Sequence, residues 1–162
     1  MSFSFPTRTL ALFLLAVSLL PAQAPLSFTG AWKLNLAKSK LETPNPPTAS
    51  TVTITFNGAH WHYQRTHEYS ARKPETFSTD LDLNAPRPRI EKDGPLTFAS
   101  KLIREGATLV LHEDITATNG QQATNTIRYT LTNNAKTLTE LEHKQTPSHN
   151  ETNRWVFDRV PK

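Results

Sequence analysis

Residues 28–40 read FTGAWKLNLAKSK, and the interpretation of the whole chain begins with this stretch. Apolar side chains alternate with others from Phe28 to Leu36, which is typical of a β-strand with one buried face. The alternation then breaks into small and basic residues, so we expect the strand to end there and one helical turn to follow. Gly30 and Trp32 stand at the start of the strand, where a barrel would close on itself.

An export signal precedes this strand. Residues 10–20 form an almost unbroken apolar run, and Pro21-Ala22-Gln23-Ala24 ends it with small residues in an A-x-A pattern. The run is shorter than the roughly 20 residues that a membrane-spanning helix needs. We therefore expect a signal peptide at residues 1–24, although Pro25 disfavours a cut directly after Ala24. The mature domain is then residues 25–162, exported to the periplasm or the medium, with no transmembrane span.

Composition narrows the possible classes of protein. The chain has no cysteine, which excludes disulfides and thiolate metal sites. Its formal net charge is +4, but the basic residues are scattered rather than gathered in runs, which argues against a nucleic-acid partner. A mature domain of this length can bury a substantial core without such cross-links. The oligomeric state is left open.

The pattern after residue 28 predicts an all-β protein. Two proline-rich stretches, residues 43–50 and 85–95, cannot hold a central strand or a helix interior. Between and after them the side chains alternate with period two, interrupted by turn dipeptides, which is typical of antiparallel hairpins. We expect a single antiparallel up-and-down barrel of eight to nine strands, because closure removes exposed sheet edges. The spacing of Leu138 and Leu141 leaves open whether their strand bulges or presents both faces.

Three hairpin registers follow from placing the apolar side chains on one face. A loop at Asn57-Gly58 and another at Glu105-Gly106 would each have two residues, whereas residues 118–120 form a three-residue loop with left-handed Gly120. The expected pairs are Phe56 with Ala59, Ile54 with Trp61, Leu102 with Leu109, Leu111 with Ile127 and Leu109 with Tyr129.

Gly30-Ala31-Trp32 at the start of the first strand resembles the Gly-x-Trp motif of the lipocalin (calycin) barrels. The late stretch NNAKTLTELE, residues 133–142, is similar to lipocalin-like domains of exported bacterial proteins of uncharacterised function. The resemblance implies that Trp32 plugs the closed end and that an arginine of the last strand stacks across it. Arg154 and Arg159 flank that strand, and either could fill this role.

Two patterns suggest chemistry, and each has a simpler explanation. His60 and His62 stand two apart on a strand, so both rings project from one face, as some metal sites require. A third ligand is missing from the pattern, so we expect no metal site and no cofactor. Asp80 with Asp82 and Glu140 with Glu142 share strand faces, and we expect both pairs on exposed faces rather than in a catalytic pair.

The inward faces carry polar residues among apolar ones. Arg65 interrupts the set that contains Trp61 and Tyr63, while Glu113 and Asn125 interrupt the neighbouring strands near Tyr129. Because buried polar groups need partners, these residues form an internal structural pair, lie near a wet open end, or anchor a ligand. Our candidate ligand-binding residues are Trp61, Tyr63, Arg65, Glu113, Asn125 and Tyr129.

The leading interpretation is an exported, non-enzymatic barrel that binds a small apolar or amphiphilic molecule, or that has a structural role in the envelope. Under it, we expect the ligand to enter at the end that holds Arg65, with residues 85–95 as a lid. One alternative is a protein-interaction module that uses the outer sheet face or the proline-rich loops. A weaker alternative is an enzyme with its site in the barrel mouth.

Overall fold

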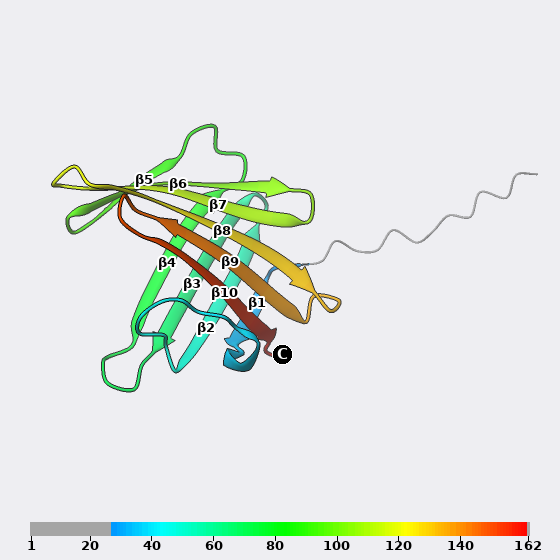
Figure 1. Ribbon diagram of the computed structural model, residues 1–162. Coiled ribbons are helices and arrows are strands. Elements are labelled where there is room, and N and C mark those ends of the chain that lie inside the picture. The colour runs from blue at the N-terminus through cyan, green and yellow to red at the C-terminus, as the bar shows by residue number, and fades with distance from the viewer. Residues whose placement is uncertain (1–26, 162) are drawn as a thin grey trace, which may run out of the picture.

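A computed structural model describes residues 27–161 as one ten-stranded antiparallel sheet with a single turn of 3-10 helix, η1 (Leu36–Lys38) (Figure 1). The expected signal peptide lies outside these residues. None of the helical segments that the structure describes is long and apolar enough to cross a membrane. The strands are β1 (Gly30–Leu34), β2 (Ala49–Asn57), β3 (His60–Glu68), β4 (Glu75–Asp82), β5 (Arg89–Asp93), β6 (Leu96–Glu105), β7 (Thr108–Ala117), β8 (Gln122–Thr132), β9 (Thr137–Gln145) and β10 (Asn150–Arg159).

The sheet curls into a near-closed barrel. Its strand order is β4-β3-β2-β1-β10-β9-β8-β7-β6-β5, so β1 pairs with both β2 and β10 and joins the two ends of the chain. Strands β2–β4 and β5–β8 form two walls that diverge on the side where β4 and β5 lie (Figure 1). No ladder joins β4 to β5 or β6 in the described residues. We call this open side the seam.

The prediction of eight to nine strands in a closed barrel was therefore wrong in two respects. There are ten strands, and the seam leaves β4 and β5 as edges. The additional strand, β5, lies inside the second proline-rich stretch, between Pro88 and Pro95. An edge strand tolerates flanking prolines because one of its sides needs no hydrogen-bond donors.

Two of the three hairpin registers differ from the prediction by two residues. In the β2–β3 hairpin Phe56 pairs with Trp61, and in the β6–β7 hairpin Leu102 pairs with Leu111. In both turns the glycine, Gly58 or Gly106, is the first of the two loop residues rather than the second, and it alone has positive φ. That is the pattern of a type II′ turn, in which glycine takes the first loop position. A shift of two residues leaves every side chain on its expected face.

The β7–β8 register was predicted correctly. Leu111 pairs with Ile127, and Leu109 pairs with Tyr129. Residues 118–120 form the loop, with Gly120 at φ 82°. The left-handed glycine closes the longer loop without strain, so the apolar faces of both strands point inward.

Strand β9 runs without a bulge and presents both faces, which corrects an expectation about its carboxylates. Leu138 is fully buried, whereas Leu141 is 42% exposed. The inward phase of Leu138 continues through Glu140 and Glu142, which are 0% and 5% exposed. Both glutamates therefore lie in the barrel interior, not on an exposed strand face, because they share the phase of a core leucine.

Trp32 is completely buried, and its indole nitrogen donates to the Phe28 carbonyl oxygen. The guanidinium of Arg159 lies 4.0 Å from the Trp32 ring centroid and also donates to the carbonyl oxygens of Ser27, Thr29 and Ala135. Gly30 has φ 152°, and a Cβ there would lie 2.5 Å from Arg159 Nη1. Arg154, the other candidate, is exposed and donates instead to the Lys38 carbonyl oxygen, because its side chain points away from the core.

Candidate ligand-binding site

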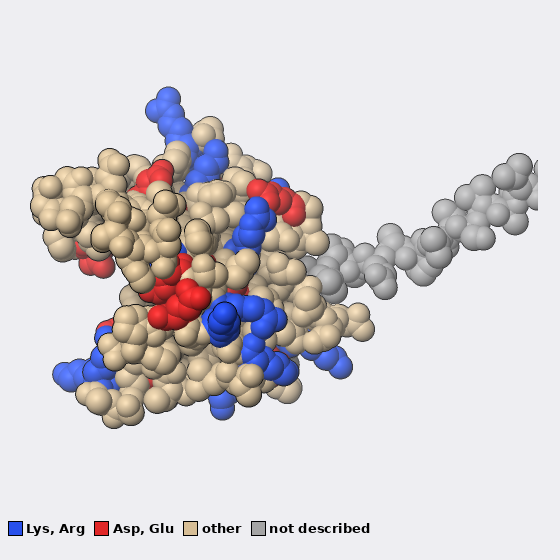
Figure 2. All heavy atoms as spheres, viewed as in Figure 1, with Lys and Arg blue, Asp and Glu red and all other residues tan. Residues whose placement is uncertain are grey.

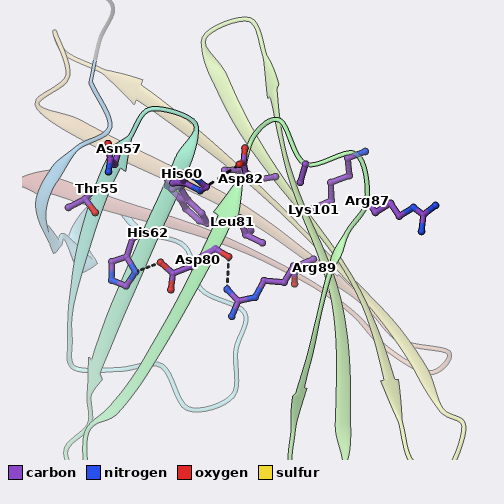
Figure 3. Close-up of a pocket in the computed structure, with 14 residues that line it drawn as sticks. Thr55, Asn57, His60, His62, Asp80, Leu81, Asp82, Arg87, Arg89 and Lys101 are labelled. Atoms are coloured by element: carbon purple, nitrogen blue, oxygen red, sulfur yellow. Dashed lines mark hydrogen bonds and ion pairs between the residues drawn. The ribbon is translucent and has the colours of Figure 1, made fainter.

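A cavity of about 620 Å³ opens at the seam. Its walls come from the β2–β3 hairpin, from β4, from the β4–β5 connection and from the middle of β6 (Figure 3). This volume is in the range of pockets that hold small molecules. The lining residues are Thr55, Asn57, His60, Trp61, His62, Asp80, Leu81, Asp82, Ala85, Arg87, Arg89, Ser100, Lys101 and Leu102.

The apolar part of this wall consists mainly of Trp61, Leu81 and Leu102. Trp61 and Leu81 are register partners on β3 and β4, and Leu102 lies on β6 across the seam. Their exposed fractions are 1%, 6% and 1%, so they belong to the core while bordering the cavity. The indole nitrogen of Trp61 is buried without a hydrogen-bond partner.

The polar rim is held by a short chain of contacts across the seam. His62 Nδ1 lies 2.8 Å from Asp80 Oδ1, and Arg89 Nη1 donates to the Asp80 carbonyl oxygen at 2.5 Å (Figure 3). The Arg89 guanidinium also lies 3.3 Å from Glu91. Arg89 therefore ties the edge of β5 to the edge of β4.

The structure places His60 and His62 beside aspartates. His60 Nδ1 lies 3.6 Å from Asp82, as His62 lies beside Asp80. Asp80 and Asp82 are on the outward face of β4, as expected. Within residues 27–161 no group of three or more His, Asp or Glu side chains is arranged to hold a metal ion.

Arg65 lies in an ion pair inside the barrel rather than free at a mouth. Its Nη2 donates to Glu140 Oε2, and the hydroxyl of Tyr63 donates to the same carboxylate at 3.1 Å. The guanidinium lies 5.0 Å from the Trp155 ring centroid and 5.4 Å from that of Phe157. The geometry matches one of the three interpretations of Arg65, the internal structural pair. The partner in this pair is Glu140, which we expected on an exposed strand face.

Glu142 is a second internal carboxylate, and it too was expected on an exposed strand face. It accepts hydrogen bonds from Trp155 Nε1 and from Asn153 Nδ2, both at 3.0 Å, and Lys144 lies 3.3 Å away. Burial alone would raise the pKa of Glu142, but Lys144, Arg65 and these hydrogen bonds together lower it. The alternation of Leu138, Glu140 and Glu142 was the signal for both carboxylates, since it places them in phase with a core leucine.

Glu113 and Asn125 are neighbours, as predicted from the register. Asn125 Nδ2 donates to Glu113 Oε2 at 3.0 Å, and Ser100 Oγ donates to Glu113 Oε1 at 3.2 Å. Burial raises the pKa of Glu113, against the opposing effect of these two hydrogen bonds. Ser100 also lines the cavity, so this polar group adjoins it.

The aromatic candidates form one cluster. The ring centroids of Trp61, Tyr63 and Tyr129 lie 5.2 to 5.8 Å apart, and all three side chains are buried. Burial raises the pKa of both tyrosine hydroxyls well above the usual value. Only Trp61 of this cluster borders the cavity, so Tyr63 and Tyr129 fill the interior.

Charge on the outer surface is mixed. On the face shown in Figure 2, basic and acidic side chains are interspersed and form no large area of one sign. This face therefore gives no electrostatic indication of a binding site.

Solved structures identify the architecture. The chain is similar to a secretory abundant heat soluble protein from Ramazzottius varieornatus (TM-score 0.59, 12% identity, 85% of this chain and 100% of that chain covered). It is also similar to the zebrafish ileal bile acid-binding protein complexed with cholic acid (0.52, 13%, 82% and 98%). A third similar structure is apo lipid binding protein 8 from Caenorhabditis elegans (0.50, 18%, 82% and 95%). The chain has a lipocalin-like β-barrel fold. No family model and no curated protein sequence matches it.

Proposed function

We propose that this calycin-type barrel binds a small amphiphilic molecule in the seam cavity. The observation that carries the proposal is a cavity of about 620 Å³ whose most buried lining residues, Trp61, Leu81 and Leu102, are apolar and whose other lining residues are mainly polar. An apolar body with a few placed polar groups is the usual composition of a small-molecule site. The proposed ligand lays its apolar part against these three side chains.

The structural neighbours support binding in general terms. One of them is a bile acid-binding protein with cholic acid bound, and another is a lipid binding protein. The interior of the present barrel supports a location at the seam, because aromatic rings and the Arg65–Glu140 pair occupy its centre. The expected entrance at Arg65 is therefore replaced by one between β4 and β5. Residues 85–89 border that entrance, whereas residues 89–93 are strand β5 rather than part of a loop lid.

Calorimetric titration with dodecanol below its solubility limit tests this function. Ala85 lines the cavity from the β4–β5 connection, so Ala85→Trp should fill the space and abolish binding without disturbing the core. Ala107→Trp, in the exposed β6–β7 turn, is the matched control and should bind like wild type. Equal binding by both variants would refute the seam site, and no binding by wild type would refute the function.

A second candidate function is protein interaction, and one observation favours it. Phe77 on β4 and Ile90 on β5 are 53% and 63% exposed, and both lie on the edge strands that border the seam. Exposed apolar side chains on unpaired edges are typical of surfaces that add a further strand. A wild-type protein that fails to bind any amphiphile in the titration above would favour this interpretation.

Export is part of the proposal and is supported by the sequence of residues 1–24. The apolar run followed by Ala22-Gln23-Ala24 has the order of a cleavable secretion signal. Mass measurement of the chain recovered from its own host should show loss of this segment, and an intact chain in the cytoplasm would contradict export.

A further inference from the structure

Among the described residues Glu113 forms no ion pair, which distinguishes it from Glu140 and Glu142. Glu140 is paired with Arg65, and Glu142 lies 3.3 Å from Lys144. In the described part of the chain Glu113 makes side-chain hydrogen bonds only to two neutral donors, the hydroxyl of Ser100 and the amide of Asn125. These bonds fix the direction of its carboxyl group but do not balance its charge.

Asn125 places a second acceptor beside this carboxyl group. Its Nδ2 is committed to Glu113, so the amide orientation is determined and Oδ1 is an acceptor. Oδ1 is buried and has no hydrogen-bond partner, and the Asn125 residue is 6% exposed. A buried hydrogen-bond acceptor without a donor is unfavourable. Glu113 and Asn125 together therefore present more hydrogen-bond acceptors than the surrounding donors can satisfy.

The seam cavity adjoins Glu113 through Ser100. Ser100 lines the cavity and donates to Glu113, which is itself only partly buried. Arg89, Ser100, Glu113 and Asn125 are successive register partners on β5 to β8 and so form one row across the inner wall. The row continues to Lys144 on β9, the register partner of Asn125. Both cations of the row have acceptors already: Arg89 is bound to Asp80 and Glu91 at the seam, and Lys144 lies 3.3 Å from Glu142.

We propose that Glu113 and Asn125 form the head-group subsite of the seam cavity and that they recognise a protonated primary amine. This inference rests on the proposed amphiphile-binding function and names its ligand class. An ammonium group carries three donors and a positive charge, so it can satisfy both the carboxylate and the amide oxygen. A carboxylate head group would meet acceptors only and would be repelled.

The ionisation of Glu113 agrees with such a ligand. Burial raises the pKa of its carboxyl group above the ordinary value, because the hydrogen bonds from Asn125 and Ser100 and the charge of Lys144 stabilise the charged form only in part. An ammonium ion beside it would add to that stabilisation, and binding would then favour the ionised carboxylate.

The test compares three probes of equal chain length by calorimetry at neutral pH: dodecylammonium and dodecanoate below their micellar ranges, and dodecanol below its solubility limit. Wild type should bind dodecylammonium at least about tenfold more tightly than dodecanol, the size expected for a charge-assisted hydrogen bond, and dodecanoate most weakly. Glu113→Gln should remove this preference, so that dodecylammonium binds no more tightly than dodecanol. Asp114→Asn, on the exposed outer face of the same strand, should keep the preference.

The outcomes separate the subsite from the function. Binding of dodecanol without a preference for dodecylammonium would overturn the subsite and leave the proposed function standing, as would a preference that survives in Glu113→Gln. Failure of all three probes would overturn both. If Glu113→Gln does not fold by circular dichroism, the order of the three affinities in wild type still decides, because a preference for dodecanol or dodecanoate contradicts the subsite.

Discussion

At the scale of single residues, the interior of this barrel is organised around charges that are buried in pairs. Glu140 is completely buried, and Arg65 is its ionic partner, flanked by the rings of Tyr63, Trp155 and Phe157. Withdrawing two charges from water is costly, and their mutual attraction together with the Tyr63 hydroxyl offsets this cost. The pair therefore contributes less to stability than its geometry suggests, but either partner alone would be strongly destabilising.

Arg65→Met should reduce the free energy of unfolding by about 3–5 kcal/mol, because it leaves Glu140 buried without a counter-charge. The double variant Arg65→Met/Glu140→Leu should recover most of this loss, since it removes both charges and keeps apolar volume. Chemical denaturation of the two single variants and the double variant measures the coupling. Additive losses in the double variant would show that the two side chains do not act as a pair.

His67 is the residue whose protonation should limit stability in acid. The ring is 7% exposed and stacks on Trp155 with centroids 5.4 Å apart, and its Nδ1 has no partner. Burial, and then the charge of Arg65, lower the pKa of His67 to about 4. In the unfolded chain a histidine takes up its proton near pH 6.5, so the unfolded state binds more protons between about pH 6.5 and 4.

Stability should therefore fall as the pH decreases from about 6.5 to about 4, through this histidine among other groups. His67→Phe keeps the stacking on Trp155 and cannot be protonated, so its unfolding free energy should depend less on pH in this window. His60→Phe, at an exposed position, serves as the control and should follow wild type. Parallel pH profiles for wild type and His67→Phe would show that His67 binds its proton over the same pH range in the folded and unfolded states.

At the scale of secondary structure, the seam is where the barrel is weakest. Strand β4 has a ladder partner on one side only, and β5 is a five-residue edge strand with every residue exposed. In the described part of the chain, the bond from Arg89 to the Asp80 carbonyl oxygen is the single hydrogen bond between β4 and β5 or β6. Local opening is expected to start from edges of this kind.

Arg89→Ala should accelerate hydrogen exchange of the amides of β4, because the cross-seam contact is lost, while the exchange of β1 and β10 stays slow. Arg87→Ala removes a neighbouring rim cation for which the structure shows no side-chain hydrogen bond or ion pair, and it should leave exchange in β4 unchanged. Hydrogen exchange followed by mass spectrometry resolves these strands. If the amides of β4 exchange at the same rate in Arg89→Ala as in Arg87→Ala, the contact from Arg89 does not hold β4 at the seam.

The hairpins show which part of an element can be predicted from sequence. Face assignment was correct in β2, β3, β6, β7 and β8 because apolar alternation determines it. The registers of two hairpins were wrong by two residues, since a glycine-containing turn of either primed type satisfies the same alternation. The buried face of strand β9 could not be predicted, because Leu138 and Leu141 lie on opposite faces of a regular strand. Only the tertiary structure shows which leucine is buried.

At the scale of the whole molecule, the antiparallel barrel was predicted correctly from the sequence, but its open seam was not. Periodicity and turn residues indicate hairpins, whereas closure depends on long-range pairing between strands that no local pattern encodes. The ionic partners in the interior were missed for the same reason: Arg65 and Glu140 are 75 residues apart. Of the candidate ligand-binding residues, Trp61 lines the cavity and Glu113 adjoins it through Ser100, while Tyr63, Arg65 and Tyr129 lie in the filled interior.

The claim that ligands occupy the seam is tested most directly by a ¹⁵N NMR titration of the wild-type protein with dodecylammonium below its micellar range. The account predicts that the largest shift changes fall on the amides of residues 80–82 and 100–102 and on the indole N–H of Trp61, which lie on both sides of the cavity. Saturable changes confined to the opposite wall, on β9 and β10, or no changes at all, would contradict a ligand site between β4 and β5.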